Sequence, residues 1–214
     1  MSITDHPAPG HPETTTAFGE LEIVYDDRVL EPRPWTADQS RWAAELDTAA
    51  PDGPMLELCS GAGQIGLLAV ALTGRRLVCV DVNPVACDFA RRNADTAGLA
   101  HLVEVREGRL EEAVAVDERF ALVIADPPWV PRAETRQFPK DPTVAIDGGD
   151  DGLDVALACV RIAADHLMPG GSAVLQLGTL AQAAQVSDGL PEVGLVAGEV
   201  RTGERGVLLR IDRR

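Results

Sequence analysis

The chain has 214 residues, of which 45% are hydrophobic and 4% aromatic. This length and composition suit a globular domain with a sizeable core and exclude fibrous or largely disordered proteins. Acidic residues outnumber basic ones by 34 to 19, for a net charge of -15. Because such a field repels phosphate backbones, a long nucleic acid is not an expected ligand.

Nothing in the sequence indicates a membrane segment or a metal site. The longest apolar run, Leu67 to Leu72, is too short to cross a bilayer, and the first seven residues lack the basic start of a signal peptide. The four cysteines have no C-x-x-C spacing. They are expected to be reduced thiols of a cytoplasmic protein, and no metal is expected.

The N-terminal region is predicted to be irregular and then to form a hairpin and a helix. Residues 1–17 are rich in turn formers and read as a flexible tail. In residues 18–30 an alternating stretch precedes Asp26-Asp27 and Val29-Leu30, which predicts a short hairpin. Thr36 follows a proline-rich loop and is a candidate N-cap for a helix ending near Ala49.

A strand, glycine loop, helix and second strand follow. Residues 54–59 read as a strand, and Gly61-x-Gly63-x-x-Gly66 leads into a helix. Residues 77–81 form the next predicted strand, which ends at Asp81. This βαβ unit is typical of a doubly wound sheet, whose ligands bind at the carboxyl ends of the strands.

Two cofactors fit the glycine loop. Its spacing satisfies the dinucleotide fingerprint of NAD enzymes, and in either case the Asp81 carboxylate would accept from ribose hydroxyls. Glu57, at the end of the first strand, would repel a pyrophosphate but attract the ammonium group of a methionine. We therefore favour S-adenosylmethionine over NAD.

The second candidate site is Asp126-Pro127-Pro128-Trp129, directly after a predicted buried strand at residues 120–125. Two prolines make a stiff bend with free carbonyl acceptors. A carboxylate, carbonyls and an indole together suit a planar group that carries N–H donors. The alternative is a proline-rich turn with only a structural role.

The remaining segments continue the alternation of strands and helices. Residues 130–145 contain three prolines and are predicted to be a loop over the site. The other expected elements are a strand at 102–105, a helix at 109–116, a helix after Asp154, stopped by 168–171, a strand at 173–177, a helix at 180–190, and a final strand pair at 195–197 and 207–211.

Four segments resemble the HemK/PrmC family, class I methyltransferases that modify a glutamine side chain of release factors. Val29–Thr36 is similar to the family's P-R-P-x-T segment, Glu57–Gly66 to its cofactor loop, Asp126–Trp129 to its N-P-P-Y turn, and Asp147–Asp154 to its D-G-G-x-D-G-L-D segment. The resemblance covers the catalytic domain only. It implies an α/β, Rossmann-like fold with a seven-stranded, mostly parallel sheet whose last strand is antiparallel.

The resemblance divides residues 18–214, taken as a single methyltransferase domain, into an N-terminal hairpin and helix (18–50) and a Rossmann-like core (51–214). It also assigns site residues. The catalytic residues would be Asp126, Pro127 and Trp129. The cofactor residues would be Glu57, Ser60, Gly61, Gly63, Ile65, Asp81, Val82, Arg109 and Asp126. The residues of the substrate side and lid would be Pro34, Trp35, Thr36, Asp147 and Asp151.

The chain also departs from the family pattern. Asp126 stands in place of asparagine, Trp129 in place of tyrosine, and Cys59 in place of the first loop glycine. An ionised carboxylate only accepts hydrogen bonds, whereas an amide also donates. The predicted function is N-methylation of a protein glutamine or of a related peptide or small molecule. The alternatives are a natural-product tailoring methyltransferase, an adenine methyltransferase, a non-catalytic cofactor-binding subunit and an NAD oxidoreductase.

Overall fold

The computed structural model describes residues 10–214 and contains a seven-stranded sheet. Its strands lie in the order β5 (Val103–Glu107), β4 (Leu77–Asp81), β3 (Met55–Leu58), β6 (Phe120–Ala125), β7 (Leu167–Leu177), β9 (Val207–Asp212) and β8 (Val196–Thr202). Strand β9 runs antiparallel to the other six strands of this sheet. The predicted α/β fold, with the last strand antiparallel, is confirmed.

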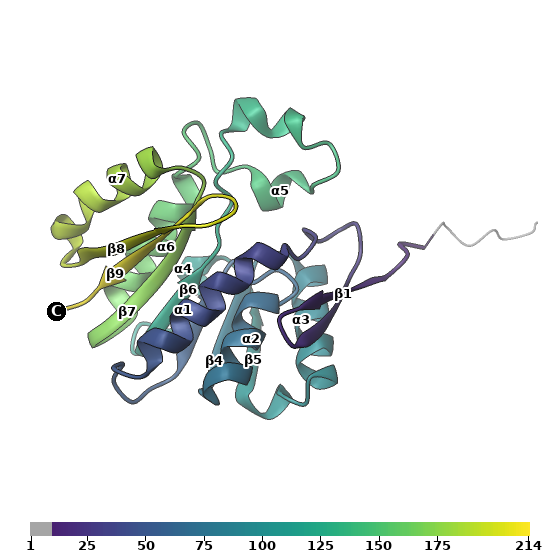
Figure 1. Cartoon of the computed structure of the whole chain (residues 1–214), viewed down its shortest axis with the longest axis horizontal. Coiled ribbons are helices and arrows are strands. Elements are labelled where there is room, and N and C mark those ends of the chain that lie inside the picture. The colour runs from purple at the N-terminus through teal and green to yellow at the C-terminus, as the bar shows by residue number, and fades with distance from the viewer. Residues whose placement is uncertain (1–9) are drawn as a thin grey trace, which may run out of the picture.

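Helices cover both faces of this sheet (Figure 1). The α-helices are α1 (Ala37–Asp47), α2 (Gln64–Thr73), α3 (Pro84–Thr96), α4 (Leu110–Ala113), α5 (Thr143–Ile146), α6 (Asp154–His166) and α7 (Leu180–Gly189). Short 3-10 helices are η1 (Pro34–Thr36), η2 (Ala100–Leu102), η3 (Arg132–Gln137) and η4 (Leu190–Val193). No helix within residues 10–214 has both the length and the apolar character needed to cross a membrane.

Two large hydrophobic clusters, one on each face of the sheet, form most of the core, and a small third one contains Trp42, Val174 and Leu208. Leu56 and Leu58 of β3 pack in a cluster with residues of α6 and α7. Met55 packs in the other cluster with residues of α1, α2 and α3. Since successive side chains of a strand point to opposite faces, this alternation fixes which face each residue of β3 occupies.

The N-terminal hairpin differs from its prediction. Strand β1 (Thr14–Phe18) pairs antiparallel with β2 (Leu21–Tyr25) around Gly19, whose φ of +59° suits a tight turn. The predicted tail therefore extends too far, since residues 14–17 belong to a strand; residues 1–9 lie outside the described part. The hairpin turn is not at Asp26-Asp27. The buried Asp26 carboxylate instead accepts hydrogen bonds from the backbone N–H and the side chain of Arg28.

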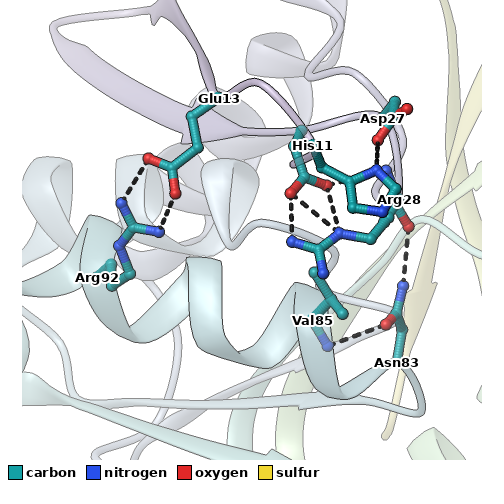
Figure 2. Close-up of polar contacts among 8 residues, drawn as sticks. His11, Glu13, Asp27, Arg28, Asn83, Val85 and Arg92 are labelled. Atoms are coloured by element: carbon teal, nitrogen blue, oxygen red, sulfur yellow. Dashed lines mark hydrogen bonds and ion pairs between the residues drawn. The ribbon is translucent and has the colours of Figure 1, made fainter. Parts of the chain in front are cut away.

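Polar contacts fasten this hairpin region to α3, as Figure 2 shows. The Arg92 guanidinium of α3 donates to both carboxylate oxygens of Glu13, at 2.7 and 2.8 Å. The Asn83 side chain caps α3 by accepting from Val85 N, and its amide nitrogen donates to the Arg28 carbonyl at 3.1 Å. The predicted asparagine cap is confirmed, and the same residue joins the hairpin region to the carboxyl end of β4.

Several other element boundaries also differ from the predicted ones. Thr36 does not cap α1 through its side chain; its hydroxyl donates to the Arg33 carbonyl, because η1 precedes the helix. The helix predicted at 109–116 is the single turn α4. Strand β7 begins directly after α6, so residues 168–171 are part of the strand. The loop predicted at 130–145 contains η3 and α5.

Candidate functional site

A cavity of about 610 Å³ opens at the carboxyl ends of β3, β4, β5 and β6. Cys59 and Gly61 line it after β3, and Asp126 and Pro128 line it after β6. These two strands are neighbours although β4 and β5 lie between them in the chain. The cavity therefore lies at the topological switch point, where doubly wound folds bind their ligands, and its size suits a small molecule.

Asp81 lines the cavity from the carboxyl end of β4. One carboxylate oxygen accepts from Gly61 N at 2.7 Å and the other from Asn83 N at 2.8 Å. Burial raises the pKa of Asp81, while these backbone donors oppose the shift. Each oxygen keeps a free lone pair, so the group can still accept from the hydroxyls of a ribose.

The glycine loop borders both the cavity and the helix α3. Gly61 has a φ of +55° and lines the cavity. Gly63 does not line it; a Cβ there would lie 3.1 Å from the Ala90 Cβ of α3. Cys59, which replaces the first glycine, has a φ of +59°, a conformation uncommon for a residue with a side chain.

Glu57 faces away from the cavity, under the helix α2. It stands between Leu56 and Leu58, so its side chain points to the opposite face, and it is only 2% exposed. Its carboxyl accepts from Gly66 N at 2.8 Å and from the Cys79 thiol at 3.2 Å. Burial raises the pKa of Glu57 to about 7. The predicted direct contact with a methionine ammonium does not fit this geometry.

Asp126 faces the cavity from the end of β6. Burial raises the pKa of its carboxyl to about 7. Among residues 10–214, no side chain or backbone group donates a hydrogen bond to this carboxyl. A carboxyl that lines a cavity and keeps its acceptor sites free can receive a donor from a ligand.

Trp129 packs against the end of β7 and does not line the cavity. A Cβ at Gly178 would lie 2.4 Å from the indole Cε3, so the ring rests directly on this glycine. The Trp129 carbonyl accepts from the Gln182 side chain at 3.1 Å. The indole is therefore not a part of the cavity wall, where the predicted contact with an acceptor would place it.

The segment from η3 to Asp147 borders the cavity like a lid. The Arg132 guanidinium donates to the Asp147 carboxylate at 3.1 Å, and the pKa of Asp147 is lowered, first by the Gly149 backbone donor and then by Arg132. Arg33 of the proline-rich loop forms an ion pair with Asp141 at 2.9 Å. The loop that resembles the P-R-P-x-T segment thus holds this lid segment.

The predicted site residues divide into two groups. Those in the cavity wall are Gly61, Asp81, Val82, Arg109, Asp126 and Asp147. Those outside it are Pro34, Trp35, Thr36, Glu57, Ser60, Gly63, Ile65, Pro127, Trp129 and Asp151. In the second group, Ser60 is buried in the loop, Ile65 is buried in the first turn of α2, and Asp151 accepts from Leu153 N.

Sequence reasoning missed one side of the cavity. Helix α6 contributes Asp154, Ala158 and Arg161 to the wall. These residues are spaced i, i+4 and i+7, so they lie along one face of the helix. That spacing was readable in the sequence, but nothing there indicated which face would meet the cavity.

Comparisons with known proteins find similarity to methyltransferases. Residues 42–139 match the family model described as "Methyltransferase small domain". A release factor glutamine methyltransferase from Deinococcus radiodurans is 33% identical over 75% of this chain and 58% of its own length. A ribosomal protein uL3 glutamine methyltransferase from Bradyrhizobium diazoefficiens is 30% identical over 82% of this chain and 58% of its own.

The fold has a solved counterpart in a methyltransferase from Pyrococcus furiosus. The two superpose with a TM-score of 0.66 at 20% identity, covering 92% of each chain. At this identity the likeness concerns the fold alone. The chain spans somewhat over half the length of the curated relatives named above.

Proposed function

Because this chain is a HemK/PrmC-like, S-adenosylmethionine-dependent methyltransferase domain of class I fold, we propose that it transfers a methyl group to a nitrogen of a protein acceptor in the cytoplasm. The observation that carries the proposal is the joint placement of Asp81 and Asp126 in one cavity, at the carboxyl ends of β4 and β6, the two strands on either side of β3. Cofactor and acceptor would meet there.

The cavity wall fits S-adenosylmethionine. Asp81 would accept from the ribose hydroxyls, and Val82, 55% exposed at the same strand end, offers an apolar surface for the adenine. Glu57 would act indirectly by holding the glycine loop through Gly66 N. The cofactor supplies an electrophilic methyl group; the chain supplies its position.

On the acceptor side, Asp126 and the Pro127 carbonyl would accept hydrogen bonds from the acceptor N–H groups. This orients the nitrogen lone pair toward the methyl group for in-line displacement. Alignment of two reactants is worth roughly 7 to 11 kcal/mol of barrier in favourable cases. The Asp126 carboxylate would also take the proton that the nitrogen loses.

The proposed acceptor is a glutamine side chain of a protein, because the relatives are named for release factor and ribosomal protein glutamines. A peptide or small-molecule amine is the second candidate. It is favoured by one observation: Asp126, in the ionised state, can accept from an amine but cannot donate to the carbonyl of a carboxamide.

The first test is calorimetric titration with S-adenosylmethionine and, separately, NAD. We expect micromolar binding of the former and at least tenfold weaker binding in Asp81→Ala, which loses the hydroxyl acceptor and the anchor of Gly61 N. Asp95→Ala, an exposed change on α3, is the control. Binding of NAD alone would refute the proposal.

A second experiment identifies the acceptor. Methyl-labelled cofactor is incubated with the chain and a release factor, ribosomal protein uL3, or a set of peptide amines. Label in a glutamine supports the first candidate, and label in amines only supports the second.

A further inference from the structure

The catalytic turn cannot hold its own shape by backbone donors. Pro127 and Pro128 have no N–H groups. The Asp126 carboxyl receives no hydrogen bond from residues 10–214. Beside the stiffness of the two prolines and the bond from Val130 N to the Ile146 carbonyl, side chains of other elements contact the carbonyls at the two ends of the turn.

Gln39 of α1 contacts the residue that precedes the turn. Its side chain is fully buried, at 0% exposure. The amide nitrogen donates to the Ala125 carbonyl at 2.8 Å and to the Val174 carbonyl of β7 at 2.9 Å. Both N–H groups of the amide are thus used to join the last residue of β6, immediately before Asp126, to the neighbouring strand β7.

Gln182 of α7 contacts the last residue of the turn. It is 8% exposed, and its amide nitrogen donates to the carbonyls of Trp129 and Asp151, each at 3.1 Å. Its carbonyl accepts from Gly178 N at 2.9 Å and from Thr179 N at 3.1 Å. Gln182 therefore connects the turn, the loop before α6 and the end of β7.

We propose that Gln39 and Gln182 are positioning residues that hold the two ends of the turn and so aim Asp126 into the cavity. The proposal rests on the proposed function, since Asp126 is taken as the group that binds the acceptor. Both residues act through carbonyls, and neither lines the cavity. A displacement of about 1 Å at a reacting group can reduce the rate on the order of a hundredfold.

The matched variants are Gln39→Met and Gln182→Met. Methionine keeps the length of the side chain and removes the amide donors; in Gln182→Met it also removes the acceptor of Gly178 N and Thr179 N. Gln185→Met is the control, because Gln185 is exposed one turn along α7 and contacts only the Asp151 carboxylate, at 3.3 Å. Thermal melts identify any variant that fails to fold.

The first measurement needs no acceptor. The chain has three tryptophans, so fluorotryptophan labelling gives three fluorine resonances, and Trp129→Phe assigns the one of interest. We expect Gln182→Met to shift or broaden the Trp129 resonance and leave those of Trp35 and Trp42 in place, with Gln185→Met changing none. An unchanged Trp129 resonance in Gln182→Met would overturn the role of Gln182.

The second measurement is the methyl-transfer rate. We expect kcat to fall about 10- to 100-fold in each variant, with the calorimetric affinity for S-adenosylmethionine within about threefold of the original. The double variant should lose less than the product of the two, because both residues hold one turn. An unchanged kcat, or a loss of cofactor affinity as large as the loss of kcat, would refute the positioning role.

The two proposals can fail separately. If the original chain methylates no acceptor, the proposed function fails. The fluorine measurement still decides whether Gln182 holds the turn.

Discussion

Glu57 at the end of β3 and Asp126 at the end of β6 invite comparison. Glu57 is buried and Asp126 is half-buried, and desolvation raises the pKa of each carboxyl to about 7. Glu57 points to the α2 face and accepts from Gly66 N and the Cys79 thiol. Asp126 points into the cavity and receives no hydrogen bond from the described residues. A raised pKa alone therefore does not distinguish the two carboxyls; the free acceptor sites distinguish Asp126, the proposed catalytic group.

The two halves of the site also differ in how they are supported. The glycine loop is fixed by nearby backbone donors, among them Gly61 N to Asp81 and Gly63 N to Ser60 O. The catalytic turn is fixed by side chains that are 86 and 53 positions away in the chain. We expect substitutions elsewhere in the fold to leave the glycine loop in place and to displace the catalytic turn.

The largest expected effect is that of Asp126→Ala on catalysis. Removal of the group that orients the acceptor and takes its proton should reduce kcat about 100- to 1,000-fold, with cofactor affinity nearly unchanged. Labelled-methyl kinetics and calorimetry measure the two quantities. Glu57→Gln is the matched change at the other strand end and should leave kcat within a few fold.

The pH profile tests the proton-accepting role of Asp126. Its pKa of about 7 predicts that the methyl-transfer rate falls about tenfold per pH unit below pH 7 and is constant above it. Only the ionised carboxyl can accept the proton of the acceptor nitrogen. Asp126→Asn should lack this acidic limb. A limb of the same position in Asp126→Asn would contradict the assignment.

Gly66→Ala should damage the cofactor half by a steric route. A Cβ at this position would lie 2.2 Å from the Glu57 Oε2, which is buried and cannot move to solvent. We expect the free energy of unfolding to fall by about 3 kcal/mol, measured by urea denaturation. Gly189→Ala is the control, since its added Cβ would meet no atom within 4 Å.

Glu57 should also make stability depend on pH. Its pKa is about 7 in the folded chain and near 4.5 when unfolded, so the unfolded state ionises first. The free energy of unfolding should therefore fall as pH rises from about 4.5 to 7, by up to about 3 kcal/mol, and then level off. Asp126 contributes in the same direction. Glu57→Gln should flatten part of this slope; an unaltered slope would show that Glu57 is ionised in the folded state.

The smallest expected effect is that of Arg33→Gln, which breaks the ion pair between the proline-rich loop and Asp141 of the lid segment. Partly exposed ion pairs contribute about 0 to 1 kcal/mol. We expect an increase of a few fold in the KM for the acceptor with no change in kcat. Arg41→Gln, which removes an exposed pair within α1, is the control and should change neither.

Several features could be predicted from the sequence because they depend on neighbours in the chain. Alternation and apolar runs indicate β3, β4 and β6, and the Asn83-Pro84 pair marks the start of α3. The carboxyl ends of parallel strands meet at one edge, so Asp81 and Asp126 were expected in one site, and the structure places both in one cavity.

Other features required the tertiary structure. The alternation along β3 puts Glu57 opposite to Leu56 and Leu58, but only the packing of α2 and Cys79 on that face turns it away from the cavity. Trp129 packs on Gly178, and Gln39 reaches Ala125, only because distant segments meet in the fold. Local sequence determines which residues can end a strand or cap a helix. The direction of a side chain at a strand end is decided by the elements that pack against it, and these come from far along the chain.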